Sequence, residues 1–281
     1  SYCFETVVEE SDTFGLTIRN NDLTYRFRYQ NSISSIEEIY QYPDQSSFFS
    51  LPRDIKITKS KNNIIGLVTN SGGSINITRL NFGNSILNDP VHDNIPSMTP
   101  FTNSNGLEII EDNEVFYALI GKNSGNQIAV LNFGDDLLND PSVSTITIPD
   151  ASGITGISLT KYCGSYYGLV TSINNDKLFK LTFKNGLNNV PQIEEVIISD
   201  ARFIQPARVK WEVENGDFFA FIQLDGSSIV RLFFGNNPNN EFSIDFFEEL
   251  SENCYAFDII KTSDDAYRYL TVDYVNATKG L

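Results

Sequence analysis

The sequence predicts an all-β fold, a β-propeller of four-stranded antiparallel blades with five clear repeats of about 50 residues and a partial sixth. Two observations lead to this prediction. One aromatic residue recurs at a nearly fixed interval, and one small residue precedes it by 14 to 16 positions in every repeat. Between these positions, short apolar segments alternate with turn residues, which is typical of strands, and no helical pattern of useful length occurs.

The recurring aromatic anchors each repeat. Its clearest copies lie in residues 79–85 (Arg-Leu-Asn-Phe-Gly-Asn-Ser) and 130–136 (Val-Leu-Asn-Phe-Gly-Asp-Asp), and both are followed by a turn that ends in Asn-Asp-Pro. A fixed period in this range indicates a repeat architecture in which each repeat is one supersecondary unit. The intervals between anchors are 53, 51, 50 and 51 residues, and the anchors are Tyr29, Phe82, Phe133, Phe183 and Phe234.

The small residue recurs at nearly the same interval, on the predicted second strand of each unit. Its intervals are 51, 52, 50 and 52 residues, and its five copies are Gly15, Gly66, Ala118, Gly168 and Ala220. Glycine normally weakens a strand, so its recurrence indicates close packing. We expect each small residue to make room for a large ring from the neighbouring sheet.

One β-propeller domain is expected over residues 1–281. In the clearest unit the predicted strands are residues 106–111, 114–120, 127–133 and 144–149. The units are residues 1–48, 49–98, 99–150, 151–200 and 201–250, with the partial sixth at 251–281. Because the first residue is Ser rather than Met, we expect the domain to be part of a longer protein.

The partial sixth unit has two predicted strands, at residues 256–261 and 267–274, and ends before a sixth anchor. Either this blade is short or the array of repeats continues, and the sequence leaves both open. Cys3 and Cys254 lie at nearly the same position of their units. In a closed ring of six units they would be neighbours, so a disulfide between them is one alternative and two buried thiols are the other.

Composition excludes several classes of function. The net charge is −16, with 36 acidic and 20 basic residues, which argues against nucleic-acid binding and against adsorption to anionic lipid. Three cysteines and one histidine exclude a disulfide-rich scaffold and a zinc site built mainly from His and Cys. No apolar segment approaches the ~20 residues of a membrane helix, so direct membrane insertion is not expected.

The run Arg-Leu-Asn-Phe-Gly-Asn-Ser-Ile-Leu-Asn-Asp-Pro at residues 79–90 resembles a repeat of large secreted surface proteins of Bacteroidota, with the motif Leu-x-Phe-Gly-x-Ser-Leu-x-Asn-x-Pro. Many of those proteins carry gliding-motility-associated or type IX secretion sorting regions. The resemblance is tight only at 79–90 and 130–141, since Lys184 and Gln30 replace the motif's glycine in two other units. It implies an extracellular, cell-surface segment used for display or adhesion.

The Asn- and Asp-rich turns that follow the anchors have two interpretations. Their oxygens could bind calcium, and the weak candidates are Asp135, Asp136 and Asp140. The favoured interpretation is that Asn and Asp cap tight turns, and no cofactor or other metal is expected. The single histidine, His92, is predicted to be a surface residue in or beside an outer strand.

Carboxylates give the best enzyme hypothesis, because propeller glycosidases place acids near the central channel. The candidates on or near first strands do not share one position of the repeat, so solvated or channel-lining acids are the favoured interpretation. These candidates are Glu5, Asp54, Glu108, Glu111, Glu212 and Asp258.

Three aromatic residues are candidates for ligand stacking: Trp211, Tyr162 and Tyr166. A buried aromatic is the more usual role for each of them. Tyr166 and its neighbour Tyr167 alternate along a strand, so one is expected in the core and the other more exposed.

The sequence therefore predicts a non-enzymatic binding, adhesion or display module that engages a glycan or protein partner at the cell surface through loops on one face. A carbohydrate-active enzyme and a purely architectural segment of a surface or secretion assembly are the alternatives. Function is expected where the repeats differ, in the connections at 43–53, 96–105, 149–153, 200–207 and 250–255.

Overall fold

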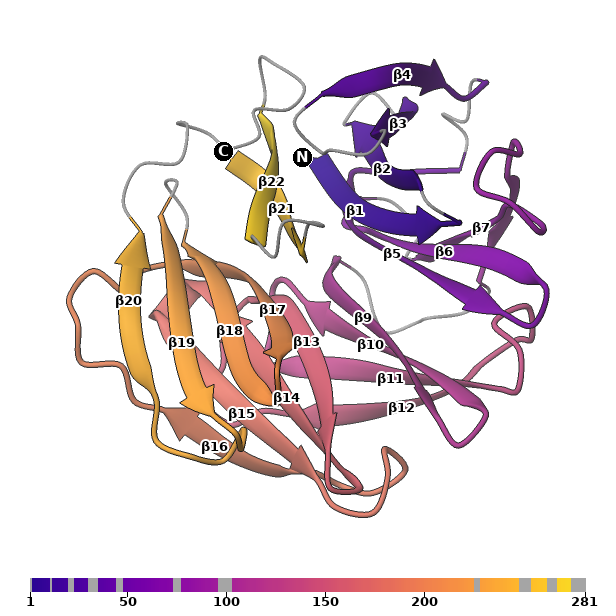
Figure 1. The fold of residues 1–281 in the computed structure, drawn as a ribbon. Helices are drawn as coiled ribbons and strands as arrows, with labels where there is room; N and C mark the ends of the chain where they lie inside the picture. The colour runs from indigo at the N-terminus through magenta and orange to yellow at the C-terminus, as the bar shows by residue number, and fades with distance from the viewer. Residues whose placement is uncertain are drawn as a thin grey trace. The chain divides into compact units, whose positions relative to one another are not determined.

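In the residues that it describes, the computed structural model of the chain has antiparallel strands and one 3-10 turn, η1 (Ile173–Asn175), as Figure 1 shows. It describes residues 2–10, 12–19, 23–29, 35–43, 48–72, 77–95, 103–224, 228–247, 254–261 and 267–273. Within these ranges no helix is long and apolar enough to cross a membrane.

Five four-stranded antiparallel sheets form the blades, and in each the strands lie in chain order. Blade 1 is β1 (Tyr2–Glu9), β2 (Asp12–Arg19), β3 (Thr24–Tyr29) and β4 (Ile36–Gln41). Blade 2 is β5 (Pro52–Ser60), β6 (Asn63–Asn70), β7 (Ile77–Asn81) and β8 (Val91–Asn94). Blade 3 is β9 (Ser104–Asp112), β10 (Val115–Lys122), β11 (Gln127–Gly134) and β12 (Ser142–Thr147).

Blade 4 is β13 (Ile154–Tyr162), β14 (Ser165–Ser172), β15 (Lys177–Phe183) and β16 (Gln192–Val196). Blade 5 is β17 (Pro206–Glu214), β18 (Asp217–Leu224), β19 (Ile229–Gly235) and β20 (Ser243–Phe247). A two-stranded sheet follows, made of β21 (Cys254–Lys261) and β22 (Tyr267–Asp273). The predicted fold class, a β-propeller with five four-stranded repeats and a partial sixth, is confirmed.

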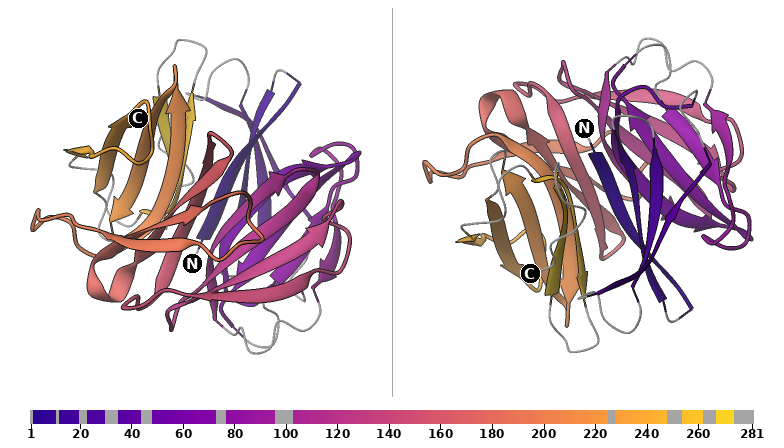
Figure 2. Two further views of the ribbon diagram at one scale, coloured as in Figure 1. Left: turned by 90° about the horizontal axis from the view of Figure 1, so that it is seen from below. Right: turned by 90° about the horizontal axis from the view of Figure 1, so that it is seen from above.

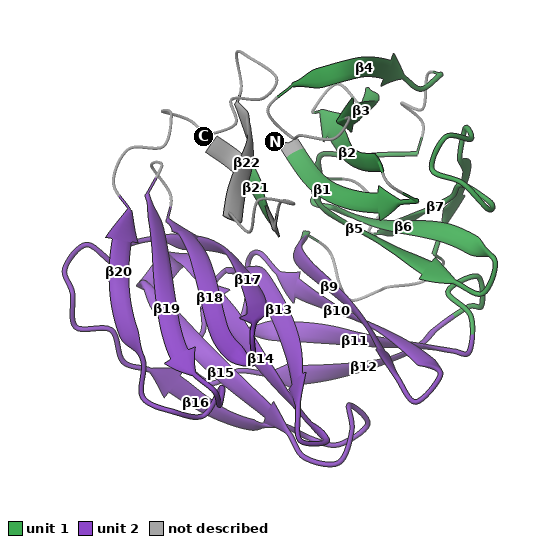
Figure 3. Ribbon diagram, viewed as in Figure 1, with its two compact units in different colours: residues 1–104, 136–140, 254–281 green, residues 105–135, 141–253 purple. Residues whose placement is uncertain are grey.

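The chain divides into two compact units, coloured separately in Figure 3. Unit 1 is residues 1–104, 136–140 and 254–281, and within it β1 packs against both β5 and β21. Unit 2 is residues 105–135 and 141–253. Within it β10 packs against β13, and β17 packs against β13 and β14, so blades 3, 4 and 5 are successive neighbours, as the views of Figure 2 also show.

The turn after the anchor aromatic has the same local structure in blades 2 and 3. Gly83 and Gly134 have φ of 65° and 68°, a left-handed conformation that glycine adopts without a steric cost. The Asn two residues earlier accepts a hydrogen bond from each glycine N–H, at 2.8 Å from Asn81 and 2.9 Å from Asn132. In blade 4, where Lys184 replaces the glycine, Asn185 takes the positive φ instead, at 61°.

All five anchor aromatics are buried, with at most 4 % of their surface exposed. The small residues lie opposite the strand that carries the anchors, for example Gly66 opposite Leu80 and Ala118 opposite Leu131. One expectation about them is wrong. A Cβ on Gly15 would lie 2.7 Å from the Phe4 ring, and one on Gly66 would lie 3.5 Å from Leu80. The nearest groups therefore come from the same blade and not from the neighbouring sheet.

Candidate functional site

A repeated set of contacts joins each of the first three blades to the turn that follows the next anchor. The last residue of the first strand accepts a hydrogen bond from a turn N–H in three copies. Glu9 accepts from Ile86 N at 3.1 Å, Ser60 from Leu137 N at 3.0 Å, and Asp112 from Leu187 N at 3.4 Å. Because these pairs lie 75 to 77 positions apart, they are tertiary contacts that fix each turn on the preceding blade.

The fourth copy differs for a chemical reason. The turn residue equivalent to Ile86 is Pro238, which has no N–H to donate. The strand residue equivalent to Glu9 is Tyr162, whose ring packs edge-on against Phe218 with 5.2 Å between ring centroids. The strand thus ends in a hydrogen-bond acceptor where the turn residue has an N–H to donate, and it ends in an aromatic residue where the turn residue is proline.

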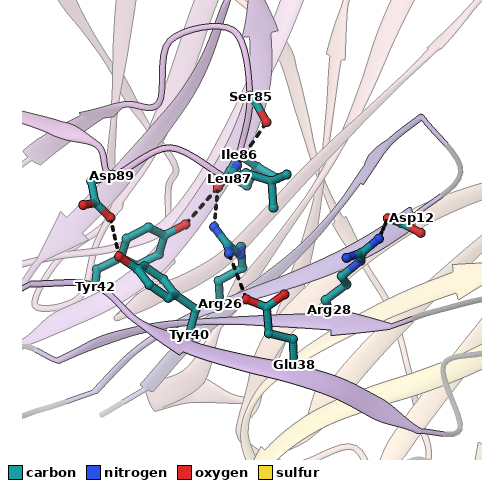
Figure 4. Close-up of polar contacts among 10 residues, drawn as sticks. All are labelled: Asp12, Arg26, Arg28, Glu38, Tyr40, Tyr42, Ser85, Ile86, Leu87 and Asp89. Carbon is teal, nitrogen blue, oxygen red and sulfur yellow. Dashed lines mark hydrogen bonds and ion pairs between the residues drawn. The ribbon is translucent and has the colours of Figure 1, made fainter.

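The residue three positions before the anchor lies beside the turn of the next blade, and it differs between blades. In blade 1 it is Arg26, which is 5 % exposed and donates to the Ile86 carbonyl at 3.2 Å (Figure 4). Its guanidinium carbon lies 4.8 Å from the centre of the Tyr40 ring, and the Tyr42 hydroxyl donates to the same carbonyl at 3.0 Å. Arginine and tyrosine side chains therefore fill the space beside this turn.

Arg79 acts in the same way on residues 136–140. It is 5 % exposed and donates to the Leu137 carbonyl at 2.7 Å and to the Asn139 carbonyl at 3.0 Å. It also pairs with Asp93, which lies opposite it on β8. We call these two places, at Arg26 and Arg79, the filled boundaries.

In blade 4 the equivalent residue is Lys180, and here a pocket of about 510 Å³ is open. The Lys180 ammonium lies 3.2 Å from Asn239 Oδ1 and 3.4 Å from the Glu194 carboxylate. The amide nitrogen of Asn239 donates to the Tyr167 hydroxyl at 3.1 Å. The full lining is Ser165, Tyr167, Lys180, Thr182, Lys184, Asn185, Gln192, Glu194 and Asn239.

In blade 3 the equivalent residue is Val130, and a smaller pocket of about 280 Å³ is open beside it. The Tyr117 hydroxyl donates to Asn188 Oδ1 at 2.9 Å across this pocket. Its lining has no charged side chain and includes Ser142, Ser144, Thr145 and residues 187–190. We call the places at Val130 and Lys180 the open boundaries, and both lie within unit 2.

A second pair of positions changes together with the first. The open boundaries combine a strand tyrosine with a turn asparagine, Tyr117 with Asn188 and Tyr167 with Asn239. At the equivalent positions the filled boundaries have only apolar residues: Phe14, Leu87, Ile65 and Leu138. The open boundaries therefore expose hydrogen-bonding groups where the filled ones do not.

The three predicted stacking residues lie elsewhere. Trp211 is 6 % exposed and packs against Phe234, with 4.9 Å between ring centroids. Tyr166 is 1 % exposed, and its hydroxyl donates to Asp112 at 2.7 Å. Tyr162 is half-buried. The expected contrast between Tyr166 and Tyr167 is small, since Tyr167 is also buried at 7 % exposed, but its hydroxyl faces the 510 Å³ pocket.

The calcium candidates are spread over different environments. Asp136 Oδ1 accepts hydrogen bonds from the Ser60 hydroxyl and from Leu138 N, both at 3.0 Å, while Asp135 and Asp140 are exposed. Among the described residues no group of three or more His, Cys, Asp or Glu is placed to hold a metal ion. Calcium binding at these turns stays a prediction.

The remaining candidates have structural surroundings. His92 lies on the outer strand β8, half-buried and stacked on Phe48 at 4.8 Å, and burial lowers the pKa of its imidazole. Cys3 is buried, but the side chain of Cys254 lies outside the described residues, so their disulfide stays a prediction. Parts of the predicted connections at 43–53, 96–105 and 250–255 also lie outside the described residues, namely 44–47, 96–102 and 250–253.

At least four of the six candidate acids on first strands contact a neighbouring group. Glu5 pairs with Lys56 at 3.0 Å, and Glu212 lies 3.4 Å from Lys210. Asp258 is 1 % exposed and accepts from Thr6 N at 2.9 Å. Asp54 accepts from Ile55 N at 3.0 Å, while Glu108 is half-buried and Glu111 exposed.

Comparisons with known structures give several propellers. Aleuria aurantia lectin in complex with α-methyl-L-fucoside has a TM-score of 0.61 at 8% identity, covering 100% of this chain and 93% of that one. AofleA from Arthrobotrys oligospora has a TM-score of 0.66 at 9% identity, covering 98% and 80%. An exo-β-1,3-galactanase from Phanerochaete chrysosporium with galactose has a TM-score of 0.62 at 8% identity, covering 95% and 73%.

At these identities the similarity establishes the fold alone. Neither the family models nor the curated proteins compared with this chain give a match. The sequence analysis did not predict the open boundaries, because it relied on the positions that the repeats share and not on those where they differ. The available signal was the residue three before the anchor, which is Arg26, Arg79 and Arg231 in three units but Val130 and Lys180 in the other two.

Proposed function

We propose that this protein is a non-enzymatic glycan-binding module and that the pocket at Lys180 is its binding site. The observation that carries the proposal is the pocket itself, about 510 Å³ in volume, at a position where two other repeats are filled by a buried arginine. Its volume lies in the range of sites for small ligands, roughly 300–1,000 Å³.

The lining suits a sugar. Hydroxyl groups of a sugar both donate and accept hydrogen bonds, so a site needs both kinds of partner. Glu194 and the amide oxygens of Asn239 and Gln192 accept, whereas Lys180 and Lys184 donate. Asn239 is already positioned by Tyr167 and Lys180, so little side-chain entropy is lost when a ligand binds it.

The named neighbours support a saccharide as the ligand class. Two are a lectin with a bound fucoside and a galactanase with bound galactose. The galactanase makes a carbohydrate-active enzyme the second candidate, with acids of the first strands as its catalytic groups. Against this candidate, Glu5, Glu212 and Asp258 each have a charged or hydrogen-bonding neighbour that would have to be displaced.

We further propose that the module is displayed on a cell surface after export. This part rests on the motif at residues 79–90 and 130–141 and its resemblance to surface proteins of Bacteroidota. Detection of the native protein on intact cells with an antibody to the domain would test it, and signal only after lysis would contradict it.

A glycan array followed by calorimetry on the whole chain tests the binding proposal. Asn239→Leu places in the open boundary the residue type that Leu87 provides in a filled one, and we expect it to weaken binding about tenfold or more through the loss of hydrogen bonds. The matched control, Leu87→Asn, should leave binding unchanged. Unchanged binding by Asn239→Leu would contradict the assigned site, and turnover of chromogenic glycosides that is lost on changing a first-strand acid would favour the enzyme.

A further inference from the structure

We infer that the pocket at Lys180 selects a sugar residue that carries an anionic group, a carboxylate or a sulfate. This inference rests on the proposed glycan-binding function and adds the chemical class of the ligand. The first reason is local charge. The chain has a net charge of −16, yet the pocket is lined by two lysines, Lys180 and Lys184, against one carboxylate, Glu194.

The second reason is that the Lys180 ammonium is held only by side chains. The arginines of the filled boundaries donate to backbone carbonyls, which would be left unpaired in a buried place if the arginine moved. Lys180 instead contacts Asn239 and Glu194, and the Glu194 side chain is 47 % exposed. The ion pair is partly exposed, with the Lys180 side chain 16 % exposed, so its net contribution is modest and an incoming anion can replace Glu194 as the partner.

The third reason is Lys184, which only blade 4 provides. It stands where three other units have Gly83, Gly134 and Gly235 and the first unit has Gln30, and Asn185 has taken over the left-handed backbone conformation. Lys184 is exposed, and in the part of the chain that the structure describes it has no ion-pair partner. An anion in the pocket would therefore meet one cation held in place and a second that can approach it.

The pocket at Val130 provides a comparison inside the same unit. It lies at the equivalent place, has a Tyr–Asn pair of the same kind, and has no lysine in its lining. Preference for an anionic sugar should therefore belong to one pocket per chain and not to both.

Calorimetric titration of the whole chain with three oligosaccharides of equal length tests the inference: a neutral one, one containing a uronic acid, and a sulfated one. We expect at least one acidic ligand to bind more tightly than the neutral one, with one site per chain. Glu194→Gln should strengthen acidic binding, because it removes a competing carboxylate, and should weaken neutral binding, because a strong acceptor is lost. Lys184→Gln should weaken acidic binding about tenfold and leave neutral binding unchanged.

Lys177→Gln is the matched control, since Lys177 pairs with Glu195 on the same blade but does not line the pocket. Raising the salt concentration should weaken the acidic ligand more than the neutral one. The inference would be overturned if the neutral oligosaccharide bound more tightly than both acidic ones and Lys184→Gln did not alter its binding. The proposed function would still stand in that case. Failure of all three saccharides to bind would overturn both.

Discussion

The filled and open boundaries of this protein differ at a few equivalent positions of the same repeat. At Arg26 and Arg79 a buried guanidinium binds carbonyl groups of the following turn. In the part of the chain that the structure describes, Val130 and Lys180 make no such contact, and pockets of about 280 and 510 Å³ lie beside them. The anchor aromatic is buried in every blade. The repeat therefore fixes the blade, and the residue three positions before the anchor differs between the two filled boundaries and the two boundaries that have a pocket.

The largest effect should come from what the two kinds of boundary share. Phe82 and Phe183 are each 1 % exposed, one at a filled and one at an open boundary. We expect Phe82→Ala and Phe183→Ala to lower the free energy of unfolding by about 3–5 kcal/mol each, because each leaves a cavity in a packed core. Urea unfolding measures this, with Val190→Ala, a change at a residue 91 % exposed, as the control. A clearly smaller loss at one of them would show that the blades do not share one packing scheme.

The next effect separates the boundaries. Arg79→Ala removes the donor to two carbonyls and should cost about 1–3 kcal/mol, whereas Lys180→Ala removes only a partly exposed ion pair and an amide contact and should cost about 1 kcal/mol or less. Parallel urea unfolding of the two variants measures the difference. Equal losses would remove the distinction between filled and open boundaries.

A pH dependence should follow from the tyrosines of unit 1. Burial raises the pKa of Tyr42 from 10.0 to about 12, and burial does the same for Tyr29. The neutral phenol is therefore favoured in the folded state. Each neutral phenol contributes its full stabilisation of the folded state below about pH 10, where it is protonated in both the folded and the unfolded state. This stabilisation is lost as the pH rises toward about 12.

At about pH 11 the loss should be about 1 kcal/mol for each tyrosine. The change Tyr42→Phe removes one ionisable phenol and its part of the pH-dependent loss of stability. The urea midpoint should therefore fall less between about pH 9 and 11 than it does in the unchanged protein. An unchanged slope would show that Tyr42 is not protonated preferentially in the folded protein.

The smallest expected effect converts an open boundary into a filled one. Val130 lies opposite Ser144 as Arg79 lies opposite Asp93, so the double change Val130→Arg, Ser144→Asp recreates the ion pair. We expect stability to rise by about 0.5–1.5 kcal/mol, because the new guanidinium can donate to the turn at residues 187–190. Val130→Met, which adds volume without a donor, is the control. A fall in stability would show that the turn in blade 4 cannot accept an arginine.

Much of the fold could be predicted because its determinants are local. The anchors and the small residues recur with one step, and strands, turns and blade order follow from patterns within about 50 residues. The reason given for the small residues was wrong, since the groups nearest Gly15 and Gly66 belong to their own blades. Two residues that recur at the same interval indicate a repeat, but the interval does not show which groups are in contact.

The candidate site could not be predicted in the same way. Trp211 and Tyr166 were natural candidates by residue type, yet both lie in packed interiors, where large rings bury the most apolar surface. Lys180, Tyr167 and Asn239 are unremarkable in sequence and become a site because a turn of blade 5 meets a sheet of blade 4. Asn239 lies 59 positions from Lys180 and 72 from Tyr167, so their proximity becomes visible only when the neighbouring blades are placed together.

By itself, then, the sequence determined the blade, because the burial of alternating apolar residues and the conformations of Gly, Asn and Pro are decided by neighbours along the chain. Only the tertiary structure decided which boundaries are filled and which are open. That outcome depends on whether a long cationic side chain of one blade reaches carbonyl groups about 60 positions away, as Arg26 reaches Ile86. The change from arginine to valine or lysine is visible in the sequence, but the energy of such a contact exists only after both blades have formed, so the sequence does not show which carbonyl groups the side chain reaches.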